Sequence, residues 1–123
     1  MSRSDALLQW LHEGRTLAGQ LTPTKPGRTA WIGIYVLEPE HPETKPILRR
    51  HKLSILPGIT TPVYRIRLFE IDDALRETWF AEPDMENKRD YIVIGDEALL
   101  AKLSELAVPL ECLDSPWLVD YPL

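Results

Sequence analysis

The segment around His41 holds a first group of side chains that could do chemistry. His41 lies among Glu38, Glu40 and Glu43, and imidazole and carboxylate groups together can bind Zn²⁺ or Mn²⁺. Three prolines interrupt the stretch from 38 to 46, which extends the backbone and splays the side chains. Because the segment also has a single histidine, the sequence favours a solvated acidic loop here over a metal site.

A second arrangement is superficially similar to the PD…ExK pattern of metal-dependent nucleases. Pro83-Asp84 is followed by Glu86-Asn87-Lys88. In that chemistry the first acid and the acid–lysine pair stand on neighbouring strands, so that two carboxylates hold a divalent cation and the lysine helps to position the attacking water. One residue separates the two parts in this chain, which is too short a connection between neighbouring strands.

A wider group of acids keeps a metal site open as an alternative. Carboxylates at the ends of strands can gather around Mg²⁺, and the sequence offers Glu70, Asp72, Asp73 and Asp90. Helix capping would account for Asp72 on its own. The alternative function is therefore a small divalent-metal-dependent hydrolase or nuclease.

The sequence gives little support for a catalytic nucleophile. The single cysteine, Cys112, has Glu111 and Asp114 beside it, and neighbouring negative charge raises a thiol pKa. We expect a buried structural cysteine. No GxSxG motif surrounds any serine, and no glycine-rich phosphate loop is present, so the sequence predicts no catalytic residue and no cofactor.

Basic residues form the remaining candidate group. If the segments that carry them pair as strands, up to six charges share one sheet face and could contact phosphates. Few aromatic side chains accompany them, and the net charge of −5 opposes binding to a polyanion, so nucleic acid is disfavoured. The group comprises Lys45, Arg49, Arg50, Lys52, Arg65 and Arg67.

Charge is unevenly distributed along the chain. Residues 1–67 carry ten Lys or Arg and five Asp or Glu, whereas residues 68–123 carry four and fourteen. Such asymmetry suits binding to a charged protein. We therefore expect a protein-interaction module without catalytic activity, which binds a basic partner or self-associates through its basic and acidic faces. Trp31 and Trp117 are candidates for the interface.

The elements that position these residues must fit one domain. A chain of 123 residues forms one core of ordinary size, so we expect a single domain over 1–123. No apolar run is long enough to span a bilayer, and the N-terminus lacks the layout of a secretory signal. These features predict a soluble, cytoplasmic protein that does not bind a membrane.

The first half of the chain predicts one helix and three strands. Leucines at helical spacing indicate a helix over Asp5–Thr16 with Ser4 as its cap, and a loop should follow over Gly19–Thr29. The run Ala30–Leu37 is predicted to be an interior strand, in which Gly33 marks either a bulge or a close approach by another backbone. The ambiguous stretch Ile47–Leu56 is assigned as a strand.

The strand over 47–56 should pair with Val63–Ile71, where Tyr64, Ile66 and Leu68 alternate with Arg65 and Arg67.

The second half predicts shorter elements. Asp72 should cap a helix that ends near Phe80, and Asp90–Ile94 is a short buried strand. Asp96 should then cap a helix over Glu97–Ala107. A short strand at Leu110–Cys112 precedes an irregular docked end. The sum is a single α+β domain with a mainly antiparallel sheet of four or five strands and two or three helices.

Overall fold

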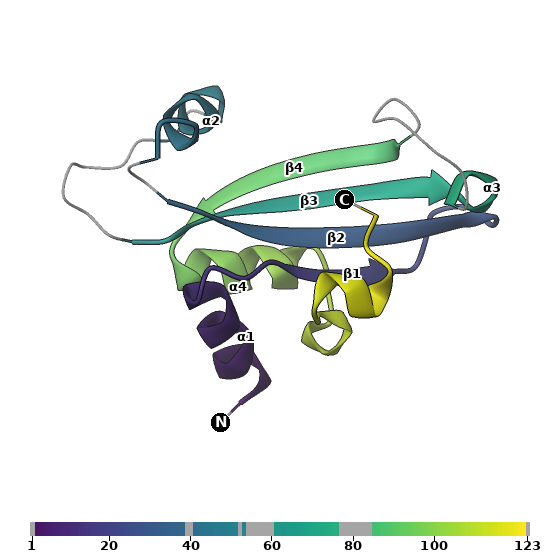
Figure 1. Cartoon of the computed structure of the whole chain (residues 1–123), viewed down its shortest axis with the longest axis horizontal. Helices are drawn as coiled ribbons and strands as arrows, with labels where there is room; N and C mark the ends of the chain where they lie inside the picture. Colours follow the sequence, from purple (N-terminus) through teal and green to yellow (C-terminus); the bar gives the residue numbers. More distant parts are fainter. Residues whose placement is uncertain (1, 39–40, 52, 54–60, 77–84, 123) are drawn as a thin grey trace.

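A computed structural model describes residues 2–38, 41–51, 53, 61–76 and 85–122 of the chain (Figure 1). One sheet runs through the whole molecule, with helices on its faces. In chain order the elements are α1 (Arg3–His12), β1 (Leu17–Leu21), β2 (Arg28–Leu37), α2 (Thr44–Arg50), β3 (Val63–Asp72), α3 (Asp73–Arg76), β4 (Glu86–Ile94), α4 (Asp96–Glu105) and the 3₁₀ turns η2 (Leu110–Cys112) and η3 (Pro116–Val119).

The sheet is an antiparallel meander in the order β1-β2-β3-β4. The two central strands, β2 and β3, pair over ten residues, from Arg28 opposite Asp72 to Leu37 opposite Val63. Long β-branched and aromatic runs favour such interior strands, because both faces of them are covered. The expected single-domain α+β fold with a mainly antiparallel sheet is confirmed.

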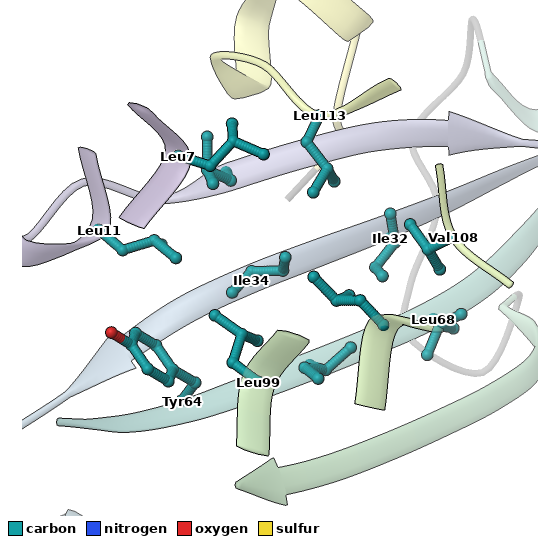
Figure 2. Packing of buried hydrophobic residues seen from close by; sticks show 12 residues of the cluster. Leu7, Leu11, Ile32, Ile34, Tyr64, Leu68, Leu99, Val108 and Leu113 are labelled. Carbon is teal, nitrogen blue, oxygen red and sulfur yellow. The ribbon is translucent and has the colours of Figure 1, made fainter. Parts of the chain in front are cut away.

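One face of the sheet, here called the helical face, packs against α1 and α4 (Figures 1 and 2). Two leucines of each helix are buried against this face, Leu7 and Leu11 in α1 and Leu99 and Leu103 in α4. The buried members of this core are Leu7, Leu11, Leu17, Ile32, Ile34, Tyr64, Ile66, Leu68, Leu99, Leu103, Val108 and Leu113. Alternation along β2 and β3 thus places this set on one side of the sheet.

The opposite face, here called the tail face, has two separate apolar areas. Trp31, Phe69 and Tyr121 form one of them, in which the Trp31 and Phe69 rings stack with their centroids 5.9 Å apart. Leu48 of α2 covers the other, over Val63 and Ile92. The C-terminal segment and α2 therefore lie over different parts of the same sheet face.

The expected strand over Ile47–Leu56 is wrong where the structure describes it, because Thr44–Arg50 forms α2. Pro46 falls in the first turn of this helix, where a missing N–H costs no hydrogen bond. Leu48 then finds its apolar partners on the tail face. The rest of that segment, 52 and 54–60, lies outside the described residues.

Three other expected elements need correction. The loop expected over Gly19–Thr29 contains the end of β1 and the first two residues of β2. The five residues of β1 are too few to give a clear alternating pattern. Helix α1 begins two residues earlier than expected, since the Ser2 hydroxyl accepts the N–H of Asp5 at 3.2 Å. The strand expected at Leu110–Cys112 is the 3₁₀ turn η2.

Other expectations agree with the structure in whole or in part. Val63–Ile71 lies within β3, and Asp90–Ile94 is the second half of the longer β4. The expected burial of Asp90–Ile94 is wrong, because β4 is an edge strand and only Ile92 of these five residues is buried. Asp72 caps α3, because its Oδ1 accepts the N–H of Ala74 at 2.9 Å; the part of the expected helix beyond Arg76 lies outside the described residues. Helix α4 is present, but Gly95 is its N-cap. Within the described ranges, no helix has the length and apolar character of a membrane span.

Candidate functional site

The C-terminal segment wraps around the outer edge of β1 and connects the two faces of the sheet. Leu113 is buried in the core of the helical face. Asp114 then pairs with Ala18 through two backbone hydrogen bonds of 3.0 and 2.8 Å. Seven residues further on, Tyr121 is buried on the tail face. The end of the chain is thus held in place at three successive points.

Two glycines make this path available. A Cβ atom at Gly19 would lie 2.7 Å from the carbonyl oxygen of Cys112, which approaches β1 on the helical side. A Cβ atom at Gly33 would collide with the phenol of Tyr121 on the tail side. The close approach expected at Gly33 therefore exists, but a side chain makes it.

The turn η3 presents two large apolar side chains to solvent. Trp117 is 79% exposed and Leu118 is 64% exposed. The backbone beneath them is fixed, because the Val119 carbonyl accepts the indole N–H of Trp31 at 3.1 Å and the amide of Gln20 at 2.8 Å. These exposed side chains therefore project from a docked segment.

Three carboxylates lie near this exposed pair along the chain, and Arg3 of α1 donates to the backbone carbonyls of Leu110 and Leu113 in the same segment. Residues 110–122 contain Glu111, Asp114 and Asp120, all exposed, and no Lys or Arg. Asp120 has a left-handed backbone with φ 54°, and the N–H of Tyr121 after it donates to Pro116 at 2.9 Å. We call Trp117, Leu118 and these three acids the tail surface. The sequence pointed to Trp117 alone among its members.

The other tryptophan singled out by the sequence is placed differently. Trp31 is 1% exposed and lies under the C-terminal segment. Its indole donates to a backbone carbonyl of the same chain. Trp31 thus belongs to the core of the described fold and offers no surface to a partner.

A strip of polar side chains crosses the tail face between its two apolar areas. Arg65 forms a two-point ion pair with Asp90, at 3.0 and 3.2 Å. The hydroxyl groups of Tyr35 and Tyr121 share a hydrogen bond. Burial and this bond raise the pKa of Tyr121, although the nearby Arg67 and Arg65 act in the opposite direction. Tyr121 is therefore a neutral phenol at physiological pH.

The basic residues of the sequence prediction are only partly assembled. Arg65 and Arg67 share the tail face, as the alternation along β3 predicts. Arg49 and Arg50 are exposed on α2, which also packs on the tail face, but they do not stand on a strand paired with β3. Lys52 lies outside the described residues.

The acids proposed for a metal site point in different directions. Glu70 is on the helical side of β3, whereas Asp90 pairs with Arg65 on the tail face. Asp72 caps α3, and Asp73 accepts the hydroxyl of Thr29 at 2.6 Å. In the described part of the chain, no three His, Cys, Asp or Glu side chains are grouped so as to hold a metal ion.

Glu70, one of these four acids, is buried, which the sequence did not predict. It is 4% exposed, and its carboxylate accepts the N–H of Thr24 at 3.0 Å and the amide of Asn87 at 2.6 Å. Burial raises the pKa of Glu70, but these hydrogen bonds and the charge of Arg28 outweigh it, so the pKa is lowered. The carboxylate ties the loop after β1 to the start of β4.

Asn87 reaches Glu70 because β4 is irregular there. The pairing of β3 with β4 shifts between Leu68 and Glu70, and Asn87 has a left-handed backbone with φ 51°. Asparagine adopts this conformation more readily than most residues. A bulge interrupts the alternation of buried and exposed residues along a strand. The contact between Asn87 and Glu70 could therefore not be predicted from the sequence.

Beside this network lies an open hollow of about 330 Å³. Its walls include Leu21, Leu68 and Pro109, and Arg89 stands among them as its charged side chain. A shallow surface of this kind can accommodate a side chain or a small molecule, but it brings no acid–base pair or nucleophile together.

Among the remaining chemical candidates, Cys112 is partly buried and not fully buried as expected. Burial raises the pKa of the Cys112 thiol, and Glu111 adds to the effect, in the direction the sequence predicts. The Nδ1 atom of His41 accepts the N–H of Glu43 at 3.2 Å, within the turn before α2. Asp96 accepts the Tyr64 hydroxyl at 2.6 Å and lies 2.9 Å from the His12 ring, which ties α1, β3 and α4 together.

Comparisons of this chain with protein-family models, with curated proteins and with solved structures found no match.

Proposed function

We propose that this protein is a small interaction module without catalytic activity, and that it binds a basic protein through the tail surface. The observation that carries the proposal is the 79% exposure of Trp117 on a fixed turn. Tryptophan is the residue type most enriched at the energetic centres of protein interfaces, because it buries a large area with few rotatable bonds.

The position of Trp117 also lowers the cost of binding. Leu118 lies beside it, and the underlying segment is already ordered by Tyr121 and by the bonds to Val119. A partner therefore does not have to order this backbone, which lowers the entropic cost of binding.

The charge of the tail surface favours one class of partner. Three exposed carboxylates accompany the apolar pair within residues 110–122, whereas one cation, Arg3 of α1, donates to backbone carbonyls of this segment. A protein with an apolar pocket rimmed by Lys and Arg complements this pattern, and opposite charges speed encounter as well as selecting the partner. The proposal thus commits to a basic protein surface.

Affinity capture from the native host's lysate, with nuclease treatment, tests this function. We expect the full chain to retain a protein that the Trp117→Ala variant retains at least roughly tenfold less, as befits an interface centre. A Glu105→Gln variant, which removes an exposed acid from α4, is the matched control and should retain the protein fully. Equal retention by Trp117→Ala, or recovery of nucleic acid alone, would contradict the proposal.

The acidic rim is tested on the partner once it has been identified. Replacing Glu111 by Gln and Asp120 by Asn removes two charges, and asparagine tolerates the left-handed backbone at 120. Binding should weaken and become less sensitive to salt, because fewer charge pairs are screened. Unchanged salt dependence would argue against a basic partner.

A further inference from the structure

The two outer edges of the sheet differ. The edge of β1 is occupied, because Ala18 exchanges backbone hydrogen bonds with Asp114. The outer edge of β4, over Glu86–Ile94, has no backbone partner among the residues that the structure describes. Figure 1 shows β4 along the border of the sheet, opposite β1. Exposed strand edges are sites where another strand can add.

The register identifies which backbone groups face outward. The N–H of Gly95 donates to Pro62 at 2.8 Å, which makes this a hydrogen-bonded pair in the antiparallel ladder. Because hydrogen-bonded and non-hydrogen-bonded pairs alternate, Tyr91 and Val93 direct their backbone groups toward β3. Asp90, Ile92 and Ile94 therefore direct theirs outward.

Only one half of this edge is protected against pairing. From Glu86 to Arg89 the strand is charged and exposed, and the bulge opposite Glu70 disturbs its pairing. Charges and bulges are the usual means of blunting an edge. From Asp90 to Ile94 the pairing with β3 is regular and the side chains are mostly apolar, so this half is open to a further strand.

We infer that two copies of this chain pair through Asp90–Ile94 of their β4 strands, antiparallel and around a two-fold axis at Ile92. The outward-facing residues then meet one another, with Ile92 opposite Ile92 and Asp90 opposite Ile94. Each facing pair exchanges two hydrogen bonds. The second copy is favoured over an unrelated strand because this register brings the basic start of β4 in one copy near the acidic first turn of α4 in the other.

Side chains in this register are compatible on both faces. On the helical face Tyr91 meets Val93 of the second copy, and no like charges face each other within the paired residues. Beyond them, Lys88 and Arg89 extend toward the first turn of α4 in the second copy, where Asp96 and Glu97 stand. Two-fold symmetry repeats this attraction, and such closed pairs are the commonest oligomers.

Sedimentation velocity over a concentration series tests the inference on the full chain. The backbone N–H of Asp90 faces outward, so Asp90→Pro removes a donor to the second copy without removing a bond to β3. Asp90→Ala is the matched control, because both variants lose the ion pair with Arg65. We expect dimers of the wild type and of Asp90→Ala, and at least a roughly tenfold higher dissociation constant for Asp90→Pro.

A wild-type chain that stays monomeric up to its highest soluble concentration overturns the inference. So does an Asp90→Pro dimer as stable as the Asp90→Ala dimer. The Arg49→Glu, Arg50→Glu variant should also remain dimeric, whereas a dimer that weakens in this variant, by an amount that depends on salt, would show pairing through the oppositely charged faces instead.

The register has its own test, which also serves if Asp90→Pro does not fold. Tyr91→Cys with Val93→Cys should form an intermolecular disulfide on mild oxidation, since the two positions face each other across the axis. Tyr91→Cys with Ala101→Cys is the control and should not. Absence of the first disulfide overturns the register.

This inference does not depend on the tail surface, and the two fail separately. Trp117→Ala should lose the basic partner but keep the dimer, whereas Asp90→Pro should do the reverse.

Discussion

The phenol of Tyr121 stands over Gly33, in the space that a Cβ atom at position 33 would occupy. This contact lies where the C-terminal segment meets the centre of the tail face. It joins the last described turn of the chain to the middle of β2, across 88 positions of sequence.

Gly33→Ala should therefore displace Tyr121 and loosen the C-terminal segment. We expect a loss of about 1–3 kcal/mol in the free energy of unfolding, as for other overpacked sites. Urea denaturation measures it. In a Tyr121→Ala background the same change should cost much less, because the colliding group is gone. Equal costs in the two backgrounds would show that Tyr121 is not what restricts position 33.

Trp117→Ala and Leu118→Ala should leave the fold intact. Both side chains are mostly exposed, so each change should alter the free energy of unfolding by no more than about 0.5 kcal/mol. Thermal melting provides the measurement. A large loss would mean that these side chains support the fold, which would remove the main reason to assign them to a partner.

Ala107→Gly should stabilise the protein. Ala107 follows α4 with φ 57°, a left-handed conformation that glycine adopts without a Cβ penalty. We expect a gain of about 0.5–1 kcal/mol in the free energy of unfolding. Ala101→Gly, in the interior of the same helix, should instead lose about 0.5–1 kcal/mol. Losses in both variants would contradict the assigned backbone at 107.

Stability should fall in acid. Burial raises the pKa values of Glu70 and Asp96, but hydrogen bonds from Asn87 and Tyr64 respectively outweigh it and lower both. Because these pKa values are lower in the folded state than in the unfolded state, where they are about 4, the charged carboxylates stabilise the fold at neutral pH. This stability is lost as the pH falls through the folded-state pKa values. The free energy of unfolding should thus decline below about pH 5.

Glu70→Gln separates the contribution of this acid. The variant should be less stable at neutral pH and should lose less stability on acidification, because its side chain does not titrate. Urea denaturation at a series of pH values measures both effects. Parallel pH profiles for the wild type and the variant would show that Glu70 does not contribute.

The sequence predicts elements well where the local pattern is strong. Alternation in Val63–Ile71 and leucine spacing in α4 reflect burial on one side, which the fold preserves. In Ile47–Leu56 neither pattern is clear, and the part of it that the structure describes as helical, up to Arg50, packs Leu48 against the tail face. Strand β1 is short and is held in place by its pairing with β2, so its own residues show no clear strand pattern.

Some features of the candidate functional residues could also be suspected from the sequence, whereas others depend on the fold. Exposure of Trp117 could be suspected from its place among prolines and acids, but the burial of Trp31 depends on a segment 88 residues away. The pairing of Glu70 with Asn87 depends on a bulge and a left-handed residue. Contacts between distant residues of this kind are decided by the fold as a whole.

The bridge between Ala18 and Asp114 limits how far the sheet can extend. A sheet with two free edges can add copies on both sides and grow into a fibre. Here the chain's own C-terminal segment occupies one edge, so each copy has a single place left for a neighbouring strand. If two copies pair through β4 as we infer, growth stops at two copies, because the backbone bonds that anchor the tail also block the edge of β1 at Ala18.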